Sequence, residues 1–387
     1  MMDGFLYDPT RADFPSRAYD VYRTLRNEHP IYYNPARRAW ALSRYSDVRD
    51  AAADHATFRS GGVTTSKGLL PMLQQMDPPR HTELRALLSR VFTPRRVVTM
   101  EPRVREITRE LIDSCASGDH CDLLHDFAAQ LPSRVVGELI GIPADRIPTF
   151  LACTEAMIGL DPHHPSPEGA KPFARIYQEF TTLLAARRAA RRDDLMSALI
   201  DAEVDGIGLS EEEVLGYCLL LVLGGNDTTL NLLANGAVLL ARHPEQRAAL
   251  VTDPSLIPTA VEEMLRYDSP TQSLPRTLSR DIELHQTTVP AGSEVWLVWG
   301  AANHDEHVFD EPERFDITRA ENPHLAFGYG SHFCMGASLA RLEARVAFEE
   351  LLARFPDYEL VSDPPWQPSS WARAYEAVPV RLSPSGA

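Results

Sequence analysis

The sequence predicts a mainly α-helical fold with a small β region, and three observations support this prediction. Apolar residues recur at helical spacing over several long segments, strand-like patterns are few and short, and the strands do not alternate with helices as a doubly wound sheet requires. Of the 387 residues, 44% are hydrophobic, which is enough to bury a large core. We expect one large domain over residues 1–387, with a β-rich part at about residues 31–45 and 280–300.

Five segments show the apolar spacing of a helix. They cover residues 79–92, 101–114, 211–242, 255–267 and 336–354. The longest segment is marked at both ends, because Ser210 and Glu213 form a capping-box pattern and His243-Pro244 ends the run. At 1.5 Å per residue this helix would span roughly 48 Å, enough to cross a whole domain.

Four short segments show strand patterns. Residues 31–33 and 40–42 are close enough in sequence to form a hairpin, and residues 282–284 and 295–298 flank turn-rich stretches. These strands are too few to form the main layer of the fold.

The composition excludes several classes of protein. The net charge is −16, from 38 basic and 54 acidic residues, which argues against nucleic-acid binding because that needs a basic surface. The N-terminus lacks the pattern of a signal peptide, and the longest apolar run, residues 217–223, is far shorter than the roughly 20 residues of a membrane span. We therefore expect a cytoplasmic protein with reduced thiols and no membrane partner.

Residues 327–336 contain the densest pattern in the chain. Glycines at positions 328, 330 and 336 allow positive φ angles and a close approach of the backbone to another group. Cys334 lies just before the predicted helix 336–354, where helix N–H groups and the helix dipole stabilise a thiolate. This arrangement suits a metal-ligating sulfur, and a buried structural cysteine is the alternative.

This loop resembles the haem-binding loop of cytochromes P450, whose pattern is F-G-x-G-x-[HR]-x-C-x-G. Every fixed position of the pattern is filled, by Phe327, Gly328, Gly330, His332, Cys334 and Gly336. The resemblance covers nearly the whole chain and implies a triangular α-rich prism that encloses haem b. It also implies that Cys334 is the proximal iron ligand, which favours O–O bond cleavage, and that His332 bonds to a haem propionate.

The long predicted helix contains a second pattern, Gly225-Asn226-Asp227-Thr228 after Gly224. Adjacent glycines cost roughly 1 kcal/mol each in a helix, so they indicate a bend or a need for space. Asp227 lies between apolar flanks, where a buried carboxylate suggests a role. The alternative is close helix packing with a solvated Asp227. By resemblance, Gly225 leaves room for O₂, while Asp227 and Thr228 deliver protons to it.

Two further sets of residues match the family. Glu263 and Arg266 share a helix face, and the resemblance joins them to Arg314 in a buried structural network; an ordinary solvated pair is the alternative. His81, Arg85 and Arg276 occupy the positions of cations that bind the haem propionates, although each alone would be read as a surface charge. The usual A-N-R-D stretch has His304 in place of the arginine, and we interpret residues 304–307 as a surface loop rather than a metal cluster.

The resemblance implies a monomeric haem-thiolate monooxygenase that takes electrons from a separate ferredoxin and ferredoxin reductase. A positive docking surface for the ferredoxin and a scatter of unrelated surface charges remain equally open for Arg90, Arg95, Arg96, Arg341 and Arg345. The alternatives are a peroxide-driven peroxygenase, which usually lacks the Asp227–Thr228 pair, and a haem-binding sensor without turnover. We interpret Cys115, Cys121, Cys153 and Cys218 as bystanders.

The expected substrate is a hydrophobic small molecule such as a steroid, terpenoid, fatty acid or polyketide, and the sequence does not choose among these classes. By resemblance, the pocket is lined by residues 60–75, 150–180, 220–224 and 271–274 and by the turn at residues 370–371. These segments are mostly apolar or neutral.

Overall fold

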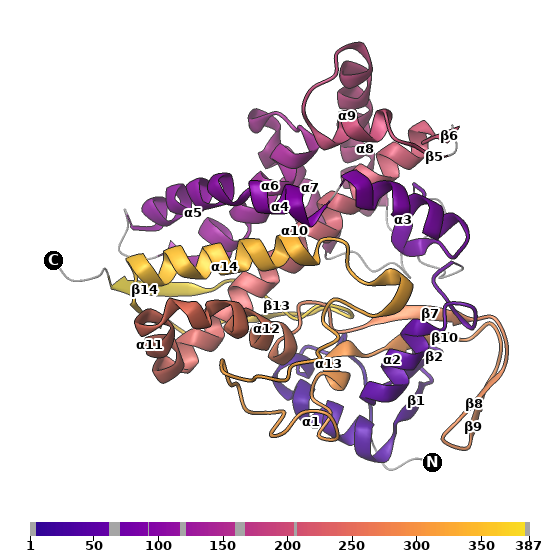
Figure 1. Ribbon diagram of the computed structural model, residues 1–387. Coiled ribbons are helices and arrows are strands. Elements are labelled where there is room, and N and C mark those ends of the chain that lie inside the picture. The colour runs from indigo at the N-terminus through magenta and orange to yellow at the C-terminus, as the bar shows by residue number, and fades with distance from the viewer. Residues whose placement is uncertain are drawn as a thin grey trace.

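Helix α10, Glu211–Arg242, runs through the middle of the molecule, and helices from both halves of the chain pack around it (Figure 1). The predicted capping box starts this helix. The Glu213 N–H donates to the Ser210 hydroxyl at 3.2 Å, and the Ser210 N–H donates to the Glu213 carboxylate at 2.9 Å. The structure, a computed structural model, describes residues 5–61, 70–91, 93–116, 121–158, 167–204 and 207–383.

All five predicted helices are confirmed, and their ends lie within two residues of the predicted ones. They are α3 (Arg80–Val91), α5 (Glu101–Ala116), α10, α12 (Ile257–Tyr267) and α14 (Ala337–Arg354). The other helices are α1 (Phe14–Glu28), α2 (Tyr45–Ala53), α4 (Pro94–Thr99), α6 (Gln130–Ile140), α7 (Ile147–Ile158), α8 (Pro167–Ala189), α9 (Leu195–Ile200), α11 (Pro244–Thr252) and α13 (Trp299–Ala302). Short 3-10 or π turns lie at Leu73–Gln75, Leu123–Ala128, Ala144–Arg146, Pro254–Leu256 and Gly330–His332.

The main sheet joins strands near the N-terminus to strands more than 200 residues later in the chain. Its strand order is β1 (Ile31–Asn34), β2 (Ala39–Leu42), β10 (Glu294–Leu297), β7 (Leu274–Leu278) and β3 (Phe58–Arg59). The predicted hairpin is confirmed, with Ile31 opposite Leu42, and β10 lies parallel to β2, with Leu297 beside Leu42. The sheet therefore cannot form before residues near position 297 are available.

Smaller sheets complete the fold. One has three strands, in the order β11 (Asp357–Leu360), β14 (Pro379–Ser383) and β4 (Cys121–Asp122). Two-stranded ribbons are formed by β8 (Ile282–Leu284) with β9 (Thr287–Val289), β5 (Glu203–Val204) with β6 (Ile207–Gly208), and β12 (Trp366–Gln367) with β13 (Ala374–Tyr375).

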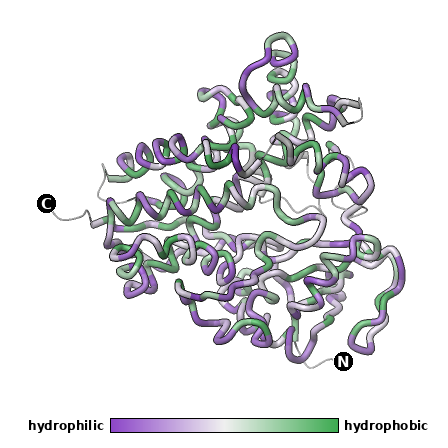
Figure 2. The backbone as a smooth tube through the Cα atoms, viewed as in Figure 1, coloured by the Kyte–Doolittle hydropathy of each residue, from purple (hydrophilic) through white to green (hydrophobic). Residues whose placement is uncertain are grey.

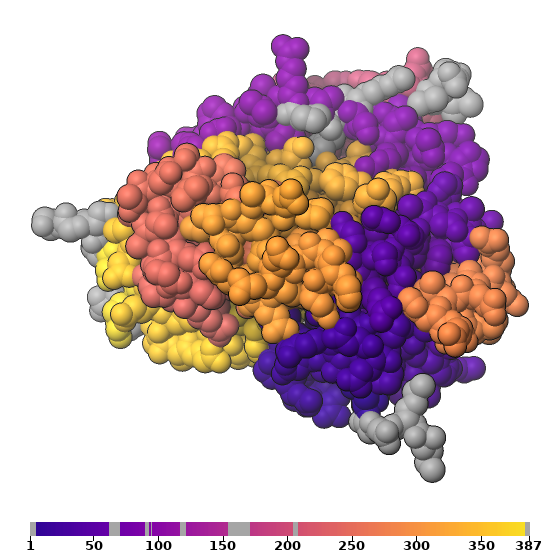
Figure 3. Space-filling model, turned by 60° about the horizontal axis from the view of Figure 1, so that its bottom comes forward, coloured from indigo at the N-terminus to yellow at the C-terminus, as the bar shows by residue number. Residues whose placement is uncertain are grey.

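The hydrophobic core surrounds α10. Hydrophobic residues gather along the central helices, and hydrophilic residues lie on the outer turns and loops (Figure 2). The largest core cluster contains Leu215 and Leu240 of α10 and Val346 of α14, all fully buried. On the face in Figure 3, the indigo N-terminal residues lie beside the orange segment that follows α13. These two parts of the chain are joined by an ion pair of 3.0 Å between Arg26 and Glu306.

The prediction that all thiols are reduced is wrong for one pair. Cys115, near the end of α5, is joined by a disulfide to Cys121 in β4. The two residues are six positions apart, and their Cα atoms lie 5.3 Å from each other, within the distance that a disulfide spans. Cys153, Cys218 and Cys334 are free.

No helix within the described ranges is both long enough and apolar enough to span a membrane. Helix α10 is the longest described helix, but its Glu211, Glu212 and Glu213 and its buried polar residues interrupt the apolar run.

Candidate active site

The loop that carries Cys334 is shaped by two glycines. Gly328 and Gly330 both have a φ angle of 71°. A Cβ atom on Gly330 would lie 2.8 Å from the Ala52 carbonyl oxygen, so this glycine lets the loop pack against α2. The Cys334 N–H donates to the Phe327 carbonyl at 2.8 Å, which closes the loop just before α14.

Cys334 is the exposed one of the free cysteines, whereas Cys218 is buried. Solvent reaches the Cys334 side chain, yet protein encloses most of it, and this burial raises the pKa of the thiol. The N–H groups of Gly336 and Ala337 and the charge of Arg85 act in the opposite direction. Because burial is the larger effect, a free thiolate is disfavoured here. A bound metal ion would supply the positive charge that the thiolate needs, since a metal ion deprotonates the thiol that it binds.

The four predicted basic side chains converge beside this loop. The rings of His81 and His332 lie 4.1 Å apart, measured between centroids. Burial, followed by the positive charges of the other three side chains, lowers the pKa of His332 to about 3. Burial also lowers the pKa of Arg276 to about 10, and Arg85 donates to the Phe333 carbonyl at 2.5 Å. The structure therefore brings together four basic side chains, two histidines and two arginines, from α3, β7 and the Cys334 loop.

Few negative groups balance this cation cluster, which consists of His81, Arg85, Arg276 and His332. His81 is 1% exposed, and neither of its ring nitrogens has a hydrogen-bond partner among the described residues. The charge of Asp77 reaches both His81 and Arg276. However, the Asp77 oxygens already accept the N–H groups of Ser60 and Gly61, at 2.9 and 3.0 Å. The cluster fits a ligand that carries more than one anionic group.

The residues of the motif at positions 224–228 of α10 lie on two different faces of the helix. Thr228 donates its hydroxyl to the Gly224 carbonyl at 2.8 Å, and Gly224 is exposed, whereas Asp227 is 4% exposed. A Cβ atom on Gly225 would lie 3.0 Å from Val136 in α6, so Gly225 lets the two helices pack closely. The sequence interpretation missed Gly224 as the glycine on the Thr228 face, although the four-residue spacing between them would have identified it.

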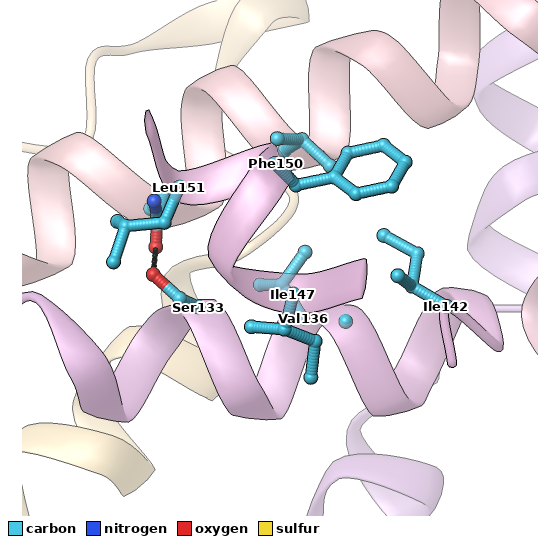
Figure 4. Close-up of a pocket in the computed structure, with 9 residues that line it drawn as sticks. Ser133, Val136, Ile142, Ile147, Phe150 and Leu151 are labelled. Carbon is cyan, nitrogen blue, oxygen red and sulfur yellow. Dashed lines mark hydrogen bonds between the residues drawn. The ribbon is translucent and has the colours of Figure 1, made fainter. Parts of the chain in front are cut away.

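A small cavity lies behind this motif, between α6, α7 and α10 (Figure 4). Apolar side chains, among them Val136, Ile142, Ile147 and Phe150, line it, and Ser133 donates to the Asn226 side-chain carbonyl at 2.6 Å. None of the predicted iron-binding or propionate-binding residues lines the cavity, whereas Phe150, Leu151 and Val222 come from segments expected to line the substrate pocket.

The network around Glu263 is buried as predicted, but its third member is different. Arg266 makes two bonds of 2.8 Å to the Glu263 carboxylate, and both side chains are fully buried. The prediction of Arg314 as the next cation is wrong, because its side chain is 63% exposed and only its carbonyl oxygen accepts from Arg266, at 3.2 Å. Arg319 takes that place, with Nε 3.1 Å from Glu263. The chain turns Phe315 into the core, and Arg314 therefore points outward.

The interpretation of residues 304–307 as a surface loop is wrong for the first two. His304 is 1% exposed and Asp305 is 4% exposed, whereas Glu306 and His307 are exposed. The His304 ring stacks on Tyr19 with centroids 4.5 Å apart, and burial lowers the pKa of His304 well below its ordinary value. A neutral imidazole therefore occupies the place of the usual arginine.

The expected substrate pocket is described only in part, because residues 62–69 and 159–166 lie outside the described residues. Leu274, at the start of β7, is 40% exposed. The Gln272 N–H donates to the Trp371 carbonyl at 2.7 Å, and Thr271 forms a bridge with Ala372. These bonds fix the segments 271–274 and 370–371 next to each other.

The expected docking arginines are partly neutralised. Arg341 makes two bonds of 2.7 Å to Glu262, and Arg345 bonds to Glu101 at 2.6 Å. The side chain of Arg90 lies outside the described residues.

Comparison with known proteins gives one family. The family model for cytochrome P450 matches residues 251–369. The chain is 39% identical over 374 residues to the steroid C26-monooxygenase of Mycobacterium tuberculosis, which covers 94% of both chains. It is also similar to the structure of a cytochrome P450 from Chondromyces apiculatus, with a TM-score of 0.92 and 36% identity over 98% of this chain and 99% of that one.

A third similar protein is a Bacillus megaterium cytochrome P450 whose crystal structure is a complex with testosterone. Its TM-score is 0.89 at 28% identity, over 96% of this chain and 100% of that one. The Cys334 loop, the long central helix and the mainly helical fold thus occur together in a chain that resembles P450 proteins over nearly its whole length. The chain belongs to the cytochrome P450 family and is a haem-binding monooxygenase.

Proposed function

We propose that Cys334 binds the haem iron and that the chain hydroxylates, or otherwise oxidises, a hydrophobic small molecule with O₂. The observation that carries this proposal is that Cys334, a free cysteine that solvent can reach, lies next to the cation cluster. Haem b has two carboxylates as well as a metal ion, so it fits both features. His81, Arg85, Arg276 and His332 would hold the carboxylates.

Bound haem supplies O₂ binding and oxidation at its iron, and a thiolate ligand favours O–O cleavage. The chain itself supplies position and protons. The Thr228 hydroxyl donates its hydrogen to the Gly224 carbonyl, so its oxygen can still accept a hydrogen bond from a proton donor such as water. Asp227, buried next to Thr228, would carry protons from solvent to that site. Gly224 leaves the Thr228 face of α10 without a side chain. Gly225 is proposed to leave room for O₂.

The proposed substrate is apolar, and steroids lead the candidate classes. Leu274 is exposed in the segment 271–274, next to residues 370–371, and apolar Leu220 and Leu223 lie on α10 before Thr228. The similar proteins include one named as a steroid C26-monooxygenase and one in complex with testosterone. Terpenoids, fatty acids and polyketides remain the other classes to test. We further propose that the monomeric protein works in the cytoplasm with a separate ferredoxin and its reductase.

The experiment that tests this function compares turnover driven by O₂ and electron donors with turnover driven by peroxide. Substrates are first found by a screen of steroids, terpenoids, fatty acids and polyketides for a shift of the haem absorption band. Product is then measured with O₂, NADPH and a surrogate ferredoxin and reductase, and in parallel with peroxide alone. We expect product with O₂ and the electron donors. Turnover with peroxide but none with O₂ would contradict the proposal and favour a peroxygenase, and no turnover with either would favour a sensor.

The proton-delivery role of Thr228 predicts a partial loss of function. Thr228→Ala should bind haem and substrate normally but form product about 10²–10⁴-fold more slowly, the range that a positioned proton donor contributes. Oxygen consumption should continue with release of hydrogen peroxide. The measurement is the ratio of product formed to O₂ consumed. A variant with unchanged coupling would remove Thr228 from the proposal.

A further inference from the structure

Tyr217, on the part of α10 that precedes the oxygen motif, contacts the Cys334 loop. Its side chain is 7% exposed, and its hydroxyl donates to the Met335 sulfur at 3.5 Å. The neighbouring buried residues of α10 are apolar or a thiol, including Leu215, Cys218 and Leu219. A phenol hydroxyl in such surroundings is costly unless it has a partner, so the bond to Met335 accounts for a tyrosine at this place.

The residue on the other side of Cys334 is held in a similar way. Arg85 of α3 donates to the Phe333 carbonyl at 2.5 Å. Phe333 and Met335 are the two neighbours of Cys334 in the chain, and each is bonded to a side chain of a different helix. The Cys334 N–H is fixed separately by the Phe327 carbonyl.

The Tyr217 hydroxyl bonds to the residue next to Cys334 in the chain, and the charge of Cys334 acts on it. Burial raises the pKa of Tyr217, with the charges of Arg85, Cys218 and Cys334 acting on it as smaller influences. The phenol is therefore a neutral donor at any ordinary pH, and its dipole is directed at the residue next to the thiol. A fixed hydrogen-bond donor near a metal-bound sulfur changes the electron density that the sulfur gives to the metal.

We propose that Tyr217 is a positioning residue for Cys334: it holds Met335, and through Met335 the iron-binding sulfur, while Arg85 holds the carbonyl of Phe333, the other chain neighbour of Cys334. The proposal rests on the proposed function, because it takes Cys334 as the haem ligand. It links the helix that carries Asp227 and Thr228 directly to the loop that carries the metal ligand. Tyr217 touches neither the substrate nor the iron in this role.

The test uses the haem-loaded enzyme and two readouts other than turnover. Tyr217→Phe keeps the ring and removes only the hydroxyl. We expect the reduction potential of the haem to shift, and the spectrum of the ferrous carbon-monoxide complex to lose its thiolate form about fivefold faster, the factor that one hydrogen bond of average net strength supplies. Met335→Leu should give the same two changes. The double variant should add little to either single variant, because both remove the same bond.

A matched control separates positioning from general stability. The Tyr358 hydroxyl donates to the Ala237 carbonyl at 2.8 Å, so it also bonds to α10 from a fully buried tyrosine, but it lies on β11, an element separate from the Cys334 loop. Tyr358→Phe should lower the melting temperature without changing the potential or the spectrum. If Tyr217→Phe behaves like Tyr358→Phe, or if its effects add fully to those of Met335→Leu, the proposal is overturned.

Cys334→Ser in the same spectral assay distinguishes this inference from the proposed function. Loss of the thiolate form in Cys334→Ser, together with no change in Tyr217→Phe, would reject the role of Tyr217 alone. A thiolate spectrum that persists in Cys334→Ser would reject Cys334 as the ligand, and the inference about Tyr217 would fail with it.

Discussion

Two buried clusters of charged residues in this molecule differ in how far their polar groups have partners. Around Glu263, two arginines surround one carboxylate, and the Asp316 N–H and the Asn322 amide complete its hydrogen bonds at 3.0 and 3.1 Å. In the cation cluster, four basic groups lie together and His81 has both ring nitrogens without a partner in the described chain. The first cluster is complete in itself, and the second is complete only with an anionic ligand.

This difference separates residues that hold the fold from residues that hold a cofactor. Burial lowers the pKa values of His81, His332, Arg85 and Arg276, and neighbouring positive groups lower those of the two histidines further. A dianionic ligand would reverse these shifts. Removal of a side chain should therefore affect folding in the first cluster and cofactor retention in the second.

The largest effect of a substitution is expected in the cluster around Glu263. Glu263→Gln leaves Arg266 and Arg319 buried without their carboxylate, which costs about 3–5 kcal/mol. The free energy of unfolding of the protein, measured with denaturant, should fall by this amount, or the variant should fail to accumulate. A loss below about 1 kcal/mol would mean that this cluster does not hold the fold.

The control for this variant is Arg314→Ala, at the position that the sequence wrongly predicted as the third member. Its side chain is 63% exposed and pairs with the exposed Glu311, so we expect a change within about 0.5 kcal/mol. An effect as large as that of Glu263→Gln would instead support the sequence prediction.

The cation cluster should respond through haem and not through folding. Arg276→Met removes a buried cation with a side chain of similar length. Hydrogen bonds to charged groups contribute about 1.5–3 kcal/mol, so haem should dissociate about 10–100-fold faster. The unfolding free energy of the haem-free protein should change little, because the loss of Arg276 also relieves repulsion of His332. Transfer of haem to an acceptor protein measures the rate, and an unchanged rate would remove Arg276 from the haem site.

A third kind of buried ionisable group, a carboxyl without a positive partner, sharpens the comparison. Glu343 of α14 is 1% exposed, one of its oxygens has no partner among the described residues, and burial raises its pKa to about 8. Between its ordinary value near 4.5 and 8, the folded state keeps a proton that the unfolded state releases, so the stability contributed by this group falls as the pH rises.

Glu343→Gln removes this pH dependence. The free energy of unfolding of the variant should rise relative to that of the native protein by about 1.4 kcal/mol for each pH unit between pH 5 and pH 8, because one unit of pKa shift corresponds to about that free energy. Chemical denaturation at several pH values measures the difference. A difference that is constant over this range would show that Glu343 ionises normally.

The long elements of the fold could be predicted from the sequence because they repeat a local rule. The capping box at Ser210, the apolar spacing of α14 and the hairpin at residues 31–42 each depend on neighbours in the chain, and all three are confirmed. The Cys334 loop was recognised because its glycines and its cysteine lie within ten residues of one another.

The errors arose where a side chain's direction depends on distant parts of the chain. Arg314 and Arg319 lie in a segment without helical or strand periodicity, so nothing local shows which one points at Glu263. His304 looked exposed because its neighbours are charged, but Tyr19 and Tyr267 from other elements bury it. The Cys115–Cys121 disulfide depends on the pairing of β4 with β14, more than 250 residues later in the chain.

The parallel pairing of β2 with β10 has a consequence for how the protein folds during its synthesis on the ribosome. Strand β2 ends at Leu42, and its partner in β10 ends at Leu297. At a synthesis rate of ~5–20 residues per second, the edge of the N-terminal hairpin waits roughly ten to fifty seconds for that partner. During this interval it is an open strand edge that can pair with other nascent chains. The yield of folded protein should therefore depend on the translation speed of the middle of the message, a region that encodes no residue of the sheet's first three strands.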